Sequence, residues 1–319
     1  MNKELKKIIT KELLLSKEVF LIGHNGIDLD AFASMAGFSL IAKKYKNKVY
    51  LIIDDKEIEP ATKLAISTMA SKLNIIKLKD VEKYMSSKSV LFVLDTNKLS
   101  RICVKDIIHD FKRVIVIDHH TKNQDTIKDA NIYIDEKATS ACEIVASLLH
   151  RFRVKVPKSY ATILLGGIVL DTNNFTYKMT RKSFYYCYYL STKGADVNEA
   201  QLYFKQDLEE YVNRSKMIAS TKINGEVAIA TGIKGKIYKT QYLAKTADIL
   251  LEFKGIKNAF AIGYVDKNTV GISARSVNKL NAGKLMETFG GGGNKNEAAA
   301  IIPNTSIKKV EEELNNIIR

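Results

Sequence analysis

Histidines and aspartates gather in four short stretches of the chain, each at the end of an apolar run. The stretches are GHNGIDLDA (23–31), LDTN (94–97), IDHH (117–120) and LDTNNF (170–175). Their candidate functional side chains are His24, Asp28, Asp30, Asp95, Asp118, His119, His120 and Asp171. Three of the chain's five histidines lie here, each with a carboxylate in its own stretch. This pattern indicates a site in which carboxylates and imidazoles act together.

Taken singly, an aspartate in such a place is usually a helix cap or a turn former, and a lone histidine is usually structural. Taken together, unpaired carboxylates would repel one another and would be costly to remove from water. Several carboxylates with two imidazoles and no thiolate suit a pair of ions such as Mn²⁺ or Mg²⁺ better than a structural zinc. Two ions about 3.5–4 Å apart can activate a water and clamp a phosphoryl group. Phosphoester hydrolysis is therefore the leading reaction class.

Short apolar runs alternate with helical patterns in the first half of the chain. Helices are predicted at 31–45 and 139–152, and strands at 19–23, 49–53, 90–95, 114–118 and 131–135. This alternation predicts an α/β fold in which helices flank a parallel sheet on both faces. Ligands of such sheets bind beyond the carboxyl ends of the strands, where His24, Asp95 and Asp118 stand.

A smaller α/β domain is predicted in the second half. An apolar run at 160–175 indicates a helix leading into Asp171, and strands are expected at 226–233, 258–265 and 269–276, with a final helix at 306–318. We expect a larger catalytic domain at 1–195, a connecting helix at 196–220 and the smaller domain at 221–319. The smaller domain contains FGGGGNKNEAAA (289–300), with four adjacent glycines. A turn rarely needs more than one or two glycines, so we expect this backbone to approach a ligand closely.

Composition describes a globular protein of 319 residues, 46% of them hydrophobic, with no apolar run long enough to cross a bilayer. The N-terminal residues predict a short amphipathic helix and lack the features of a signal peptide. Three scattered cysteines (Cys103, Cys142, Cys187) suit a reducing cytoplasm, so a cytoplasmic location is predicted.

The net charge of +15 could draw in an anionic substrate. The lysines are spread along the whole chain, however, and such a bias can also reflect an AT-rich genome. A basic nucleic-acid-binding module would rest on this charge alone, because the chain lacks a basic stretch interleaved with aromatic residues.

The four motifs resemble those of the DHH phosphoesterase superfamily, and ISARS (272–276) with the glycine-rich stretch looks like its DHHA1 domain. The resemblance covers about residues 15–305 and is strongest to the catalytic part of cyclic di-AMP phosphodiesterases of the GdpP type. Three further stretches are similar to that branch: DEKATSACEIV (135–145), GGIVLDTNNFTYKMTRKSF (166–184) and EEYVNRSKMIA (209–219).

The resemblance implies a role for each candidate residue. His24 and Asp28 would hold one metal ion, Asp95 would bridge two, and Asp30, His119 and Asp171 would complete the second. Asp118 would orient its neighbours, and His120 would face the scissile phosphate as an electrostatic or acid partner. Substrate contacts would come from Ser273, Arg275, Gly291, Gly292, Gly293 and Asn294. For Arg275, a salt bridge across the domain interface is the structural alternative. The implied cofactor is two Mn²⁺ ions per site, with Mg²⁺ or Co²⁺ as alternatives.

The sequence departs from this branch in two ways. The GdpP type carries membrane helices and sensory domains ahead of the catalytic unit; with none here, the initial Met1 and the opening helix favour a standalone enzyme over an excised fragment. The glycine run is followed by histidine in the family and by Asn294 here. An amide cannot carry the positive charge that a histidine gains beside a phosphate, which leaves substrate choice open.

The predicted function is metal-dependent hydrolysis of cyclic di-AMP or a small linear dinucleotide, with no requirement for duplex nucleic acid. One alternative is the oligoribonuclease and pAp-phosphatase branch of the same superfamily, which shares the two-domain layout. Another is a non-catalytic nucleotide sensor. The presence of the expected residue type at all six metal-ligand positions argues against it. Members of this family often dimerise, so a homodimer is a possible form of this protein.

Overall fold

The first part of the chain forms a six-stranded parallel sheet in the order β3-β2-β1-β4-β5-β6. This computed structural model describes residues 3–318 except 55–57, 177, 206 and 234. The strands are β1 (Glu18–Ile22), β2 (Lys48–Ile52), β3 (Ile75–Ile76), β4 (Val90–Leu94), β5 (Val114–Asp118) and β6 (Asn131–Ile134). The chain runs outward from β1 to β3 and then returns to the other side of β1 as β4. The carboxyl ends of β1 and β4 therefore flank the switch point where such sheets bind ligands.

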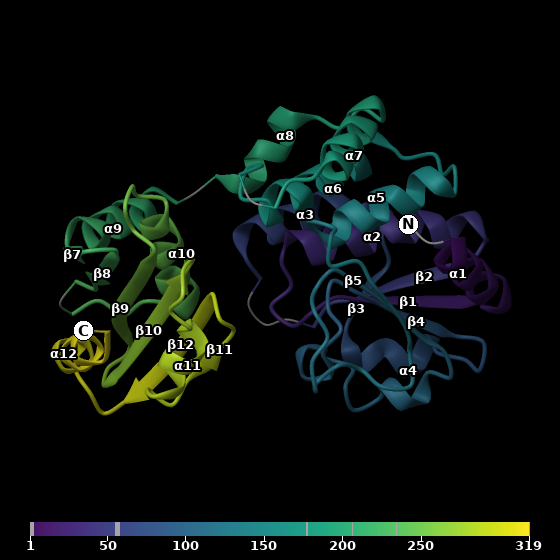
Figure 1. Cartoon of the computed structure of the whole chain (residues 1–319). Helices are drawn as coiled ribbons and strands as arrows, with labels where there is room; N and C mark the ends of the chain where they lie inside the picture. Colours follow the sequence, from purple (N-terminus) through teal and green to yellow (C-terminus); the bar gives the residue numbers. More distant parts are fainter. Residues whose placement is uncertain (1–2, 55–57, 177, 206, 234, 319) are drawn as a thin grey trace. The chain divides into compact units, whose positions relative to one another are not determined.

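Helices connect and cover these strands, which confirms the predicted fold class. They are α1 (Lys3–Leu15), α2 (Leu29–Lys44), α3 (Pro60–Met69), α4 (Val81–Tyr84), α5 (Ala141–Arg151), α6 (Lys158–Asp171), α7 (Arg181–Thr192) and α8 (Val197–Gln201). Short 3₁₀ turns lie at η1 (Ala70–Lys72), η2 (Leu78–Asp80), η3 (Leu99–Arg101), η4 (Ile108–Asp110) and η5 (Leu202–Phe204). Figure 1 shows α2, α5 and α6 on one side of the sheet and α4 on the other.

Alternating side chains of the buried strands supply two separate cores, as strand geometry requires. On one face, Leu21 of β1 and Phe92 of β4 pack in the larger core with α2, α5 and α6. On the other face, Phe20 and Val93 pack with Val81 of α4 and with the irregular segment at 102–111. The central strands are buried on both faces, so their side chains are hydrophobic and polar side chains occur only at the strand ends.

The second part of the chain forms a mixed sheet in the order β11-β12-β10-β9-β8-β7, in which only the β8–β9 pair is parallel among the described strands. Its strands are β7 (Lys222–Asn224), β8 (Val227–Thr231), β9 (Asn258–Asp266), β10 (Thr269–Ser276), β11 (Gly292–Gly293) and β12 (Glu297–Pro303). Its helices are α9 (Leu208–Ala219), α10 (Thr240–Leu251), α11 (Ala282–Glu287) and α12 (Ile307–Ile318). No helix in the described part of the chain has the length and apolarity needed to cross a membrane.

The chain divides into two units, residues 1–205 and 206–319. The charged pattern at 196–220 had predicted one connecting helix. In its place the structure has α8 and η5 in the first unit and α9 in the second, and residue 206 between them lies outside the described residues. The helical periodicity was therefore correct, but the expectation of a single continuous helix was wrong.

Gly167 allows three helices of the first unit to meet beside the strand ends. A Cβ atom at this position of α6 would lie 2.5 Å from Cys142 Sγ of α5 and 3.0 Å from Asp30 Oδ1 of α2. Asp171 follows one helical turn later, on the same face of α6. Gly167 thus lets α6 approach closely enough to bring Asp171 near Asp30.

We predict that Gly167→Ala lowers the free energy of unfolding by about 1–3 kcal/mol, because overpacking a dense core costs that much. Gly166→Ala is the matched control. Its Cβ would meet only side-chain atoms, Leu29 Cδ2 at 3.1 Å and Tyr203 Cδ2 at 3.2 Å, and no contact as short as the 2.5 Å at Gly167. Alanine also gains about 1 kcal/mol of helix propensity over glycine. Urea unfolding of both variants measures the difference; equal stabilities would contradict this role of Gly167.

Candidate functional site

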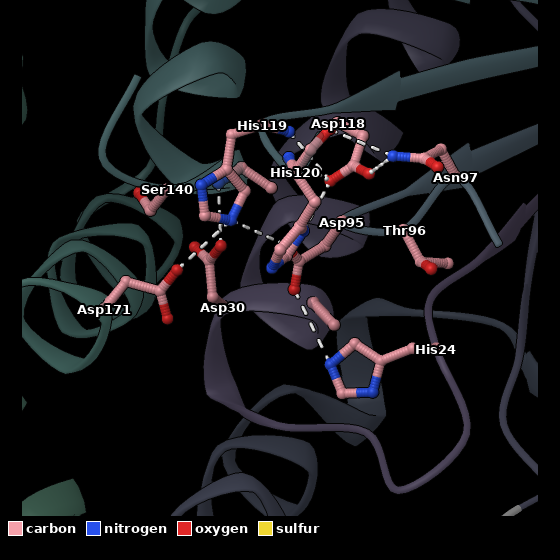
Figure 2. Close-up of polar contacts among 12 residues, drawn as sticks. His24, Asp30, Asp95, Thr96, Asn97, Asp118, His119, His120, Ser140 and Asp171 are labelled. Atoms are coloured by element: carbon pink, nitrogen blue, oxygen red, sulfur yellow. Dashed lines mark hydrogen bonds and ion pairs between the residues drawn. The ribbon is translucent and has the colours of Figure 1, made fainter. Parts of the chain in front are cut away.

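The four motifs converge at the carboxyl edge of the parallel sheet (Figure 2). His24 and Asp28 follow β1, Asp95 follows β4, and Asp118 ends β5. Asp30 lies in the first turn of α2, and Asp171 is the last residue of α6. All eight candidate side chains of the first unit therefore come from elements that end or begin at this edge.

His24 faces two carboxylates. Its Nδ1 lies 3.0 Å from the backbone oxygen of Asn25 and donates to it, which directs Nε2 inward. Nε2 lies 3.4 Å from Asp28 Oδ2 and 3.7 Å from Asp95 Oδ2. Asp28 also caps α2, since its Oδ1 accepts the N–H of Ala31 at 2.9 Å. The helix cap and the contact with His24 use different oxygens of one carboxylate, so Asp28 has both roles.

His119 forms a second group with three carboxylates. Its Nε2 lies 3.2 Å from Asp95 Oδ1 and 3.3 Å from Asp171 Oδ2. Asp30 is fully buried beside them, and its oxygens accept the N–H groups of Ala141 at 2.7 Å and Cys142 at 2.9 Å. Those N–H groups begin α5, and the positive end of a helix stabilises a buried carboxylate.

Asp95 belongs to both groups and has unusual backbone geometry. It is 3% exposed and has φ of +63°. This left-handed conformation is rare for residues other than glycine, and aspartate is among the few that tolerate it. Departures of this kind concentrate at functional sites because the surrounding structure must hold them in place. Here the turn after β4 brings one carboxylate between His24 and His119.

Crowding of the carboxylates changes their acidity. Burial, with the charges of Asp30 and Asp28, holds the pKa of Asp95 well above its usual value. Burial, with the charges of Asp30 and Asp95, does the same for the pKa of Asp171. Burial alone would lower the pKa of His24, but its hydrogen bond to Asp28 and the charges of Asp28 and Asp95 raise it to about 9. The cluster therefore retains protons unless cations take their place.

The donor set fits divalent cations. His24, Asp28 and Asp95 can each offer one ligand atom within 4.8 Å of the others, and so can Asp30, Asp95, His119 and Asp171. Asp95 Oδ1 and His119 Nε2 are buried and lie 3.2 Å apart, yet neither forms a hydrogen bond of acceptable geometry with a described residue. Buried polar atoms without partners are costly, and a bound cation would satisfy both. Carboxylate oxygens with imidazole nitrogens suit Mn²⁺ or Mg²⁺.

Asp118 and His120 lie beside this cluster. Asp118 is fully buried, and its Oδ1 lies 2.8 Å from His120 Nδ1 while its Oδ2 accepts from Asn97 Nδ2 at 2.7 Å. The His120 side chain is half exposed, so it can meet a ligand from solvent. Asn97 was part of the LDTN stretch, but nothing in its local sequence distinguished it from a turn residue.

The substrate-contact candidates lie in the second unit. Ser273 is buried and lines a pocket of about 450 Å³ together with Thr240, Leu243 and Gly291. Arg275 pairs with Asp248 of α10, within the same unit. This ion pair is a different contact from the salt bridge across the domain interface that was weighed as the structural alternative for Arg275, and that alternative stays a prediction.

Strand pairing accounts for most of the glycine run. Cβ atoms at Gly291 and Gly293 would collide with the backbone of β12, and Gly290 has φ of +74°. Gly292 alone has neither constraint: a Cβ there would meet nothing within 4 Å. Asn294 Oδ1 accepts the N–H groups of Asn296 at 2.8 Å and Glu297 at 2.9 Å, so its side chain stabilises its own turn.

The fold and the acidic–histidine site define a phosphoesterase family. Residues 18–168 match the DHH family, N-terminal domain, and residues 224–319 match the DHHA1 domain, so the chain belongs to the DHH family. It is 30% identical, over 98% of its length, to the cyclic-di-AMP phosphodiesterase PdeA of Listeria monocytogenes, of which it covers 48%. The chain spans about half the length of the cyclic-di-AMP phosphodiesterases that it matches.

Two further proteins are similar to this chain over nearly its whole length, one in sequence and one in structure. The chain is 24% identical to the bifunctional oligoribonuclease and PAP phosphatase NrnA of Mycoplasma genitalium, over 90% of this chain and 89% of that protein. The crystal structure of an exopolyphosphatase-related protein from Bacteroides fragilis superposes with a TM-score of 0.81 at 21% identity, over 98% of this chain and 96% of that one. The latter supports the fold only.

We predict that the affinity for divalent cations rises with pH across the neutral range. A cation at His24 must displace a proton held with a pKa of about 9, so affinity increases about tenfold per pH unit below that value for this one proton. Protons on Asp95 and Asp171 steepen the dependence at lower pH, because their pKa values are also raised. Mn²⁺ titrations between about pH 6 and pH 9 measure the slope. A flat profile would contradict the assignment of His24 as a ligand.

Proposed function

We propose that this chain is a divalent-metal-dependent phosphodiesterase that hydrolyses cyclic di-AMP or a small linear dinucleotide, with Mn²⁺ as its preferred ion. The observation that carries the proposal is Asp95, whose carboxylate belongs to all three groups of potential metal ligands found among the described residues. Its membership of the DHH family and its identity of 30% with a cyclic-di-AMP phosphodiesterase support the reaction class. A cytoplasmic location and a homodimer remain predictions.

Each residue of the first unit would have a distinct task. His24 and Asp28 would hold one cation, Asp30, His119 and Asp171 a second, and Asp95 would bridge them. When bound, such a pair of cations supplies an activated water and neutralises charge on the phosphoryl oxygens. Asp118 would keep the proton of His120 on Nδ1 and leave Nε2 facing the substrate. With a proton on Nε2 as well, His120 would donate to a phosphoryl oxygen and stabilise its developing charge.

The second unit would bind the nucleotide. The pocket beside Ser273 is lined by Leu243, Ile272 and Ile301 and by the backbone of Gly290 and Gly291, which suits the flat apolar face of a base. Gly292 leaves room for a ligand next to the loop. Arg275 would supply positive charge to a phosphate, and its ion pair with Asp248 would reduce the strength of that attraction. The net charge of +15 would attract the anionic substrate.

A second candidate function is that of an oligoribonuclease and pAp phosphatase. Its support is that the chain is 24% identical to NrnA over 90% of the length of this chain. Asn294 weakens the preference for the cyclic-di-AMP branch, which has a histidine at this position, because this neutral side chain is occupied with its own turn.

A substrate panel separates these functions. We expect the purified chain with Mn²⁺ to hydrolyse cyclic di-AMP or pApA with a higher kcat/KM than pAp, measured by chromatographic separation of the products. A preference for pAp and short oligoribonucleotides would favour the second function. Tight nucleotide binding without any product would favour a sensor and would overturn both.

We predict that Asp95→Asn abolishes turnover while the fold is retained. Asparagine tolerates the left-handed backbone at this position, so the change removes charge without adding strain. Loss of shared metal binding removes several kcal/mol of transition-state stabilisation, which is about 1,000-fold or more in rate. In chelator, the variant should unfold at a temperature no lower than the parent's, because one crowded carboxylate is gone. A variant that hydrolysed the same substrate at the parent's rate would overturn the shared-ligand scheme.

A further inference from the structure

A buried asparagine beside the cluster has every polar atom of its side chain in use. Asn97 follows β4 and is fully buried. Its Nδ2 donates to Asp118 Oδ2 at 2.7 Å and to the backbone oxygen of His120 at 3.0 Å. Its Oδ1 accepts from Thr126 Oγ1 at 3.1 Å. These contacts form a continuous hydrogen-bonded chain from Thr126 through Asn97 and Asp118 to His120.

The carboxylate of Asp118 is divided between two sets of donors. Oδ2 accepts from Asn97, whereas Oδ1 accepts the backbone N–H groups of His119 at 2.7 Å and His120 at 3.2 Å. The same Oδ1 lies 2.8 Å from His120 Nδ1. Because a carboxylate accepts but does not donate, His120 carries its proton on Nδ1. The half-exposed ring then presents Nε2 to solvent.

We propose that Asn97 is a positioning residue that fixes the orientation and tautomer of His120 through Asp118. The inference rests on the proposed function, in which His120 Nε2 meets the substrate. Removal of the amide would leave Asp118 Oδ2 buried without its donor, so the carboxylate would rotate or recruit a water. Either change would loosen the acceptor that holds Nδ1–H, and enzymes lose rate when such a supporting hydrogen bond is lost.

A purely structural role for Asn97 can be separated from this one. The backbone oxygen of Asn97 accepts the N–H of Ile127 at 2.8 Å, and a side-chain substitution leaves that bond in place. The loop that carries Thr126 thus stays attached to the end of β4 in an alanine variant. What Asn97→Ala removes is the side-chain link from that loop to Asp118 and to the backbone oxygen of His120.

Kinetics provide the first test. Asn97→Ala should lower kcat by about 10- to 100-fold, the usual cost of losing a supporting partner. KM should stay within about twofold and Mn²⁺ affinity should be unchanged, because the proposed function uses His120 in the transition state and assigns the cations to the other histidines and carboxylates. Thr126→Val, which removes the hydroxyl donor to Asn97 and the acceptor of the Asn123 N–H at 2.9 Å, leaves the bond from Asn97 to Asp118 in place and should show a smaller loss of kcat.

Asn47→Ala is the matched control. Asn47 is also a buried asparagine of the first unit, and its Nδ2 donates to the backbone oxygens of Leu13 at 3.0 Å and Ser16 at 2.7 Å. It precedes β2, at the opposite edge of the sheet from the site. Its loss should lower stability as much as Asn97→Ala does but leave kcat intact.

A spectroscopic test does not depend on turnover. The chain has five histidines, so ring nitrogen resonances of metal-free protein can be resolved by ¹⁵N-histidine labelling and assigned with His120→Gln. We expect protonated Nδ1 and unprotonated Nε2 for His120 in the parent, and a mixture of tautomers in Asn97→Ala. An unchanged tautomer, an unchanged kcat, or loss of Mn²⁺ binding together with kcat would each overturn the proposal. A parent without hydrolysis would refute the proposed function while this test of positioning still stands.

Discussion

The structure depends on keeping several carboxylates close together at one edge of a parallel sheet. Asp30, Asp95 and Asp171 are brought within reach of His119, and Asp28 with Asp95 within reach of His24. Mutual repulsion and burial raise the pKa values of Asp30, Asp95 and Asp171. Such an arrangement is costly for folding alone, so it indicates selection for a function that uses the charge.

The rest of the first unit offsets this cost. The start of α5 donates two N–H groups to Asp30, the close approach at Gly167 brings α6 alongside, and the buried strands β1 and β4 anchor the turns that carry His24 and Asp95. Asp95 adopts a strained backbone to present one carboxylate to both histidine groups. Helices and strands thus hold together a group of carboxylates that would otherwise repel one another.

Local sequence pattern was enough to predict most of this arrangement. The apolar runs that became β1, β2, β4, β5 and β6 are long and bounded by polar residues, so strand ends and the residues beyond them were evident. The roles of Gly167 and Asn97 were not, because each depends on which distant segments pack against it. The glycine run was partly misleading, since pairing with β12, which no local pattern revealed, explains Gly291 and Gly293.

The central claim is that Asp95 joins two cation sites into one centre. Electron paramagnetic resonance of the chain titrated with Mn²⁺ tests it most directly. The account predicts two ions per chain whose spectra show exchange coupling, and loss of that coupling in Asp95→Asn. One ion per chain, or two ions with independent spectra, would contradict it.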